Sequence, residues 1–172
     1  MTRTTNARVA GVTFIVYIVA GVASLALSGR THTTDVLSIF TSLSALVLGV
    51  TLYAITRVQD PDLAMLALTC RVVEAIPGHT GAIFFAVGST LFCWLLLRGR
   101  MIPVALAWLG FLGSLLLVVI LPLQRAGLFA GAASWFSAIT WFMWLPMLVF
   151  ELTLAVWLLV KGVATPVKVQ PA

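Results

Sequence analysis

The sequence predicts an all-α integral membrane protein, a bundle of six transmembrane helices that forms a single domain over residues 1–172. Of the residues, 62% are hydrophobic and 9% are charged, whereas roughly 25% are charged in a soluble domain. The apolar residues also gather in six runs, each close to the ~20 residues that a helix needs to cross the hydrocarbon core. Composition and run length together therefore predict a multi-pass membrane protein.

Short polar breaks separate these runs. The predicted spans cover about residues 9–28, 36–56, 63–76, 81–97, 102–123 and 134–160. Turn-forming and charged residues occupy the breaks, as in Asp60-Pro61-Asp62 and Arg98-Gly99-Arg100. The first run follows basic residues, as in a secretory signal, but it is long for a signal and five further runs follow it. We therefore expect the first run to be a retained span.

The basic residues predict the orientation. If the N-terminus is cytoplasmic, seven Lys and Arg residues lie on the inner side, and only Arg30 and Arg125 lie outside. The inner seven are Arg3, Arg8, Arg57, Arg98, Arg100, Lys161 and Lys168. Because positively charged residues are enriched in cytoplasmic loops, both termini are predicted to be cytoplasmic.

Several other classes are disfavoured. The formal net charge is +5, but the basic residues stand singly at the ends of apolar runs, so nucleic acid is not an expected partner. Cys70 and Cys93 form no C-x-x-C pair and are expected to be small buried residues. The two histidines, His32 and His79, are expected in outer loops, where they would not ligate a haem between spans. We predict no cofactor and no metal site, and no familiar enzyme motif is present.

Three charged residues interrupt the apolar spans. Arg71 and Glu74 are three residues apart in the third span, which places them on one helix face, and Glu151 lies in the sixth. At ~1.5 Å per residue, Arg71 is about 14 Å from Asp62 and Glu151 is about 15 Å from Lys161, measured from the same membrane face. An ion pair between Arg71 and Glu151, with Glu74 alongside, is therefore geometrically allowed. We predict that Arg71 and Glu151 are energetically coupled.

This polar centre has one carboxylate in excess. If all three groups are ionised, their net charge is −1, and in a medium of low dielectric constant the centre is expected to hold one proton near neutral pH. Ionisable residues inside a membrane are rare, and a functional role is the default hypothesis for them. The alternative is that the three charges only join helices.

Aromatic residues near the centre are candidates for a cavity lining. Trp141 and Trp144 precede Pro146, which is expected to bend the sixth helix. Tyr53, in the hydroxyl-rich second span, is a further candidate. The tryptophans also suit an aromatic belt at the headgroup level, and hydroxyl groups also bond across helix interfaces.

Over nearly its whole length, the chain resembles domain-of-unknown-function family 4386, a bacterial family of small polytopic membrane proteins. The features that carry the resemblance are Arg8 with Gly11, "LAMLALTCRVVEA" from Leu63, the pair Phe84-Phe85, "LLRGRMIP" from Leu96 and "FELTLAVWLLVKG" from Phe150. The resemblance implies a helical fold in the bacterial inner (cytoplasmic) membrane, with no assigned activity. Its members are longer between the third and fourth helices, where this chain has only Pro77 to Thr80.

Three functions remain open from the sequence. The first is binding or transport of a small or lipidic molecule, in which Arg71 holds an anionic group or Glu151 exchanges a proton. The second is a membrane-embedded enzyme that acts on a lipid or isoprenoid, with Glu74 or Glu151 as general acid. The third is a structural or accessory subunit. The lipid bilayer is the expected partner in all three, the oligomeric state stays open, and a cavity that reaches Arg71 and Glu151 would favour the first two.

Overall fold

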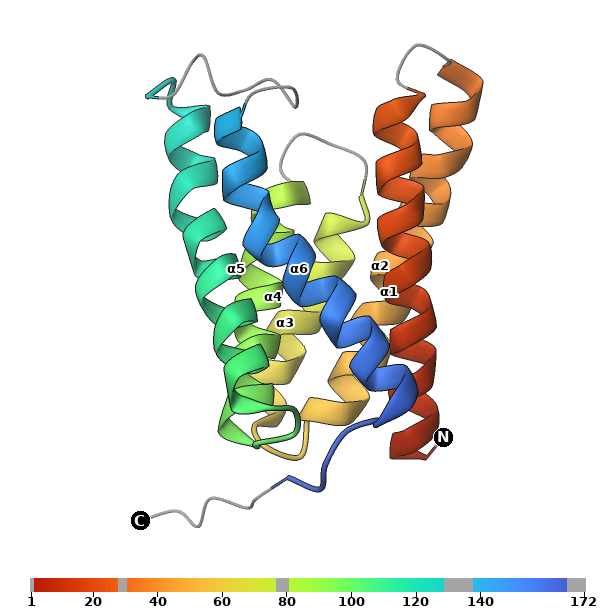
Figure 1. Ribbon diagram of the computed structural model, residues 1–172, viewed down its shortest axis with the longest axis vertical. Helices are drawn as coiled ribbons and strands as arrows, with labels where there is room; N and C mark the ends of the chain where they lie inside the picture. Colours follow the sequence, from red (N-terminus) through yellow and green to blue (C-terminus); the bar gives the residue numbers. More distant parts are fainter. Residues whose placement is uncertain (1, 28–30, 77–80, 129–137, 167–172) are drawn as a thin grey trace.

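The computed structural model describes residues 2–27, 31–76, 81–128 and 138–166, and in this part of the chain all regular structure is helical (Figure 1). The helices are α1 (Arg3–Ala26), α2 (Thr31–Thr56), α3 (Pro61–Glu74), α4 (Gly81–Arg98), α5 (Val104–Arg125) and α6 (Ala138–Val160). Five of them, all except α3, are long and apolar enough to cross a membrane. The predicted all-helical membrane fold is confirmed to this extent.

The third helix is the short one. Asp60 caps its N-terminus by accepting a hydrogen bond from the backbone N–H of Leu63 at 3.1 Å, and Pro61 occupies the first turn. The helix then ends at Glu74 after 14 residues. Such a helix is about 21 Å long, against the ~30 Å of the hydrocarbon core. The third predicted span is therefore helical, but it does not qualify as a complete span by its own length.

The helices form a ring in which each packs against its neighbours in sequence, and α6 closes the ring against α1. Figure 1 shows that α6 crosses the bundle obliquely, from beside α5 at one end to beside α1 at the other. At the α1 end the contact is close, because a Cβ on Gly11 would lie 2.9 Å from the carbonyl oxygen of Ala155. The oblique course of α6 therefore joins it to α1 at one end of the bundle and separates the two helices at the other.

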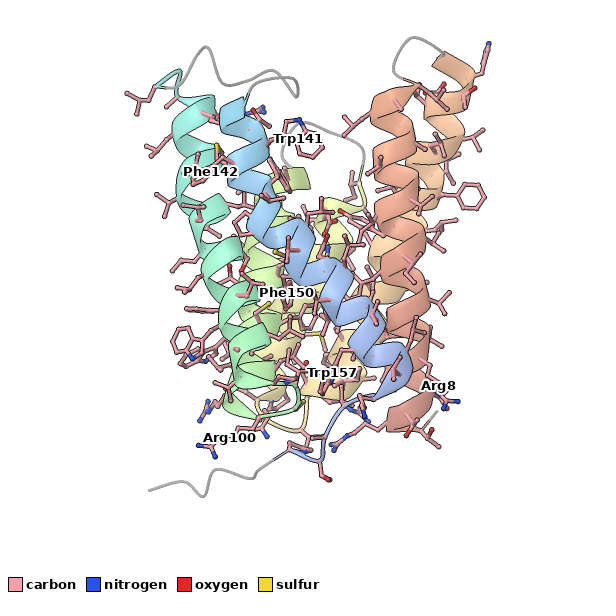
Figure 2. The ribbon with its side chains drawn as sticks, viewed as in Figure 1. Arg8, Arg100, Trp141, Phe142, Phe150 and Trp157 are labelled. Carbon is pink, nitrogen blue, oxygen red and sulfur yellow. The ribbon has the colours of Figure 1, made fainter. Side chains whose placement is uncertain are left out.

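Basic residues gather at the end of the bundle where α1 begins and α6 ends. Arg8 and Arg100 mark this end in Figure 2. There Arg98 lies 3.8 Å from a carboxylate oxygen of Asp60, and Lys161 follows the last turn of α6. Arg125 ends α5 at the opposite end. The uneven distribution of charge that was predicted between the two faces is thus present in the fold, while Arg30 and Lys168 lie outside the described residues.

Candidate functional site

Arg71 is buried in α3 and is paired within its own helix. Its side chain is 1% exposed, and its Nη1 donates a hydrogen bond to Oε2 of Glu74 at 2.7 Å. The hydroxyl group of Tyr17, on α1, donates to the other carboxylate oxygen of Glu74 at 2.8 Å. The contact expected from the spacing of Arg71 and Glu74 is therefore formed, and both oxygens of Glu74 are engaged.

Aromatic rings cover the guanidinium group of Arg71. Its central carbon lies 4.9 Å from the ring centroid of Phe85 and 5.9 Å from that of Tyr17, within the range of a cation–π interaction. The two rings stack on each other, with their centroids 6.3 Å apart. On α2, Gly49 leaves room for this arrangement, because a Cβ there would lie 2.9 Å from the Cβ of Arg71. The charge of Arg71 is thus compensated by Glu74 and screened by two rings.

Glu151 is the second carboxyl group of the centre, and it takes no part in the pairing of Arg71 with Glu74. It is 5% exposed in α6, and its Oε1 has no hydrogen-bond partner among the described residues. The ion pair with Arg71 that equal depth allows is not formed, because Glu74 lies one helical turn from Arg71 and takes its place. Glu151 still interacts electrostatically with both Arg71 and Glu74. The three predicted residues therefore form one centre, with a different pairing from the one expected.

A cavity of about 420 Å³ ends at Glu151 and is called the Glu151 cavity below. Trp141 and Trp144, two of the candidates named from the sequence, line it together with Tyr17 and Phe85. Its remaining walls come from α1, α2 and α6 and are mainly apolar. An adjacent cavity of about 220 Å³ shares Tyr17, Phe85 and Trp144 with it and reaches Glu74. Both carboxyl groups of the centre therefore border a space large enough for a small molecule.

The Glu151 cavity opens where α1 and α6 separate. Its lining includes the exposed side chains of Val22, Leu25 and Trp141, and Figure 2 shows Trp141 at the end of the bundle opposite to Arg8 and Arg100. One turn closer to the basic end, Phe14 on α1 and Leu154 on α6 are buried in the core. The cavity is thus open toward the surface of the bundle and closed toward its basic end.

Tyr53 does not line this cavity, which corrects the expectation from the sequence. The cavity contacts α2 through Ser38, Thr41 and Ser42, and Tyr53 lies about 16 Å or more further along the helix axis, at 1.5 Å per residue. There its ring lies 5.9 Å from the guanidinium carbon of Arg57, at the basic end. The many hydroxyl groups of the second span could not show at which depth along the helix the cavity ends.

The other candidate residues have simple positions. Cys70 and Cys93 are buried free thiols, as expected. His32 lies in the first turn of α2, rather than in a loop, and is exposed, while His79 lies outside the described residues. Within the described ranges, no three His, Cys, Asp or Glu side chains come together as a metal site would require. The α6 helix continues through Pro146.

Tyr17 and Phe85 are the site residues that sequence reasoning missed. Tyr17 is the single hydroxyl-bearing aromatic residue in the apolar run of α1, and it donates to a residue 57 positions away. A phenol inside a span needs a hydrogen-bond partner, and this need was the available signal. Phe85 gave no signal, since a phenylalanine in an apolar run is ordinary.

Comparison with known families identifies part of the chain. Residues 78–162 match the family described as a domain of unknown function (DUF4386). The matched part covers α4, α5 and α6, and it contains Glu151 and the motifs that begin at Leu96 and Phe150, whereas Arg71 and Glu74 precede it. Neither a curated protein nor a solved structure matches the chain. Over residues 78–162, this match confirms the resemblance to the family of this domain of unknown function, DUF4386.

Proposed function

We propose that this membrane protein binds a small, largely apolar molecule in the Glu151 cavity. The observation that carries the proposal is a mainly apolar cavity of about 420 Å³ that ends on a buried carboxyl group with an unpartnered oxygen. Ligand pockets are typically about 300 to 1,000 Å³, with apolar walls and a few polar groups that orient the ligand. In this cavity, Glu151 is the orienting group.

The geometry supports binding more than the other functions open from the sequence. An accessory role would need the charges only as links between helices, yet Oε1 of Glu151 makes no hydrogen bond. A role for Glu74 as general acid is less favoured, because both of its oxygens already accept hydrogen bonds. An anion at Arg71 would meet a guanidinium group whose charge Glu74 already compensates, although its Nε has no hydrogen-bond partner among the described residues. Transport would require a second conformation in which the core between Phe14 and Leu154 opens. Because a transported molecule must first be bound, ligand binding is the step that a binding protein and a transporter share.

The exposure of the cavity lining supports a ligand that arrives from the membrane. Val22 and Leu25 of α1 are exposed on the outer surface of a helix whose apolar residues suit lipid contact. A molecule dissolved in the bilayer would reach the cavity between α1 and α6 without passing through the aqueous loops. The proposed ligand is therefore a lipidic or otherwise membrane-soluble molecule.

We further propose a topology of six helices with both termini in the cytoplasm of a bacterial inner membrane. The concentration of basic residues at the end where α1 begins supports this orientation. The short α3 would enter from the cytoplasmic face and end at Glu74, below the outer membrane surface. The Glu151 cavity would then open in the outer half of the bilayer.

Reporter fusions test this topology. Green fluorescent protein fused after Ala172 is expected to fluoresce, because it folds in the cytoplasm, and alkaline phosphatase inserted at Gly78 is expected to be active, because it folds outside. The reciprocal pair, phosphatase after Ala172 and fluorescent protein at Gly78, serves as the control. Active phosphatase at Ala172 would overturn the proposed topology.

Filling the cavity tests ligand binding. Gly21 lines the Glu151 cavity, and a Cβ there would meet no atom within 4 Å, so Gly21→Phe places a ring in the cavity without a clash at the backbone. We expect a diazirine derivative of octanol to label Glu151 in wild-type protein in membranes. Because the ring occupies the space of the ligand, Gly21→Phe should reduce this labelling at least about tenfold, which is about 1.4 kcal/mol of binding free energy.

Val19→Phe is the matched control. It lies two residues away on the same helix, but its side chain is 61% exposed and does not line the cavity. This variant is expected to label like the wild type. Equal labelling of Glu151 in Gly21→Phe and the wild type would show that the alkanol does not occupy the cavity, and would contradict the proposal.

A further inference from the structure

We infer that the ligand of the Glu151 cavity is a hydrophobic monovalent cation, such as a lipophilic amine, and that it binds in exchange for a proton on Glu151. This inference rests on the proposed function and adds the chemical class of the ligand. Its basis is the pairing inside the polar centre, which leaves one buried carboxyl group without a cation.

The charged side chains around Glu151 already neutralise one another, so Glu151 has no cation of its own. Arg71 on α3 is neutralised by Glu74, one turn away, and Tyr17 on α1 uses its hydrogen to complete that pair. Cys93 on α4 also interacts electrostatically with Glu151. In the described residues, α2 and α5 carry titratable side chains only toward their ends, and Glu151 is the only one in α6. Ionised Glu151 would therefore be an uncompensated charge.

A buried charge of this kind is unstable without a partner. Burial of an unpaired carboxylate is costly, so the group either holds a proton or meets a cation. Arg71 is engaged by Glu74, and an anionic ligand would add a second uncompensated negative charge. Among charged ligands, only a monovalent cation that replaces the proton of Glu151 leaves the centre neutral.

The walls of the cavity suit a hydrophobic cation. Trp141, Trp144, Tyr17 and Phe85 all line it, and the faces of aromatic rings attract cations, with Trp the strongest. The ring centroids of Phe85 and Trp144 lie 5.8 Å apart, and both side chains line the cavity together with Glu151. The remaining apolar lining would bury the hydrocarbon part of the ligand, so both parts of an amphiphilic cation find a complementary surface.

The exchange is balanced in charge. The O–H bond of the Glu151 carboxyl group breaks, the proton leaves to water, and the carboxylate pairs with the positive charge of the ligand. One positive charge enters as one leaves, so the net charge of Arg71, Glu74, Glu151 and ligand stays at zero. Because proton and cation compete for one carboxylate, ligand affinity should rise with pH.

Two probes of nearly equal shape and opposite charge test the inference: tetraphenylphosphonium and tetraphenylborate. Purified protein is titrated with each radiolabelled ion at pH 6 and pH 8, and binding is followed by scintillation proximity. We expect tetraphenylphosphonium to bind more tightly at pH 8, by up to about tenfold per pH unit. Tetraphenylborate should bind at least about tenfold more weakly than the cation.

Variants of Glu151 test whether this residue is responsible for the pH-dependent binding of tetraphenylphosphonium. Glu151→Gln should lose about tenfold or more in tetraphenylphosphonium affinity and become insensitive to pH, since its amide cannot exchange a proton. Glu151→Asp keeps a carboxyl group and should keep the pH dependence. If Glu151→Gln does not fold, the pH dependence of Glu151→Asp decides, and loss of that dependence would overturn the inference.

The outcomes separate the inference from the proposed function. Failure of both probes to bind the wild type would overturn the inference, whereas the proposed function is decided by the labelling of Glu151 with the octanol derivative. Equal binding of the two probes, or unchanged cation binding in Glu151→Gln, would overturn the inference, and the proposed function would stand if Gly21→Phe still blocks binding while Val19→Phe does not. Cation binding that is lost in Glu151→Gln and in Gly21→Phe, with the expected pH dependence, supports both.

Discussion

Replacement of Arg71 by Met is expected to destabilise the protein by about 3 to 5 kcal/mol, the usual cost of removing one partner from a buried ion pair. The cause is the stranded Glu74, which would keep the hydrogen bond from Tyr17 at 2.8 Å but lose its cation at 2.7 Å. Thermal or SDS-induced unfolding in detergent measures the loss. Arg8→Met, at an exposed position of α1, is the control and should change stability by no more than about 0.5 kcal/mol.

A double-mutant cycle then identifies the partner of Arg71. Arg71→Met combined with Glu74→Gln should lose clearly less than the sum of the single losses, because no charge is left stranded. The coupling of Arg71 to Glu151, predicted from their equal depth, should be smaller, since those residues interact only electrostatically. Additive losses for Arg71 and Glu74 would contradict the pairing in α3, and stronger coupling to Glu151 would restore the pairing first predicted.

Gly110→Ala is expected to have the second largest effect, about 1 to 3 kcal/mol of lost stability, from overpacking. A Cβ on Gly110 of α5 would lie 2.5 Å from two ring atoms of Phe150 on α6 and 2.7 Å from Sγ of Cys93 on α4. Since Phe150 precedes Glu151, the shift of α6 should also alter the Glu151 cavity. The same unfolding assay measures the loss.

Two further variants control this prediction. Gly21→Ala makes the same chemical change where no atom lies within 4 Å, and should be neutral or slightly stabilising. Phe150→Leu combined with Gly110→Ala should recover part of the loss, because the smaller side chain removes the clashing ring. A Gly110→Ala protein as stable as the wild type would show that α5 and α6 are not packed as closely as this geometry requires.

Much of the helical fold could be predicted, because hydropathy is a local property of the chain. The second span was predicted to end at residue 56 and the sixth at residue 160, and α2 and α6 end there. Helix starts were predicted less well. The first span was expected from residue 9, whereas α1 begins at Arg3, where the side chain of Thr2 accepts a hydrogen bond from the backbone N–H of Thr5. Capping by polar residues extends a helix beyond the apolar run that reveals it.

The members of the polar centre could also be predicted, but their pairing could not. Depth along the helix axis followed from counting residues, and it allowed Arg71 and Glu151 to interact, which they do only electrostatically. The choice of Glu74 as partner depended on how α3 is rotated about its axis and on the hydroxyl group that α1 supplies through Tyr17. Rotation and helix neighbours are set by packing across the bundle, which a single sequence does not reveal.

By itself, the sequence determined that the chain is an all-helical membrane protein and that Arg71, Glu74 and Glu151 interrupt its apolar spans, because composition and spacing are properties of the chain in one dimension. Only the tertiary structure decided that Glu151 is left without a cation and that a cavity leads to it. The first result follows from the pairing of Arg71 with Glu74 inside α3. The second follows from the oblique course of α6, which contacts α1 near Gly11 and leaves it toward Trp141. A helix crossing arises from the shapes of side chains on two helices far apart in sequence, and it is that crossing which turns a buried carboxyl group into a candidate binding site.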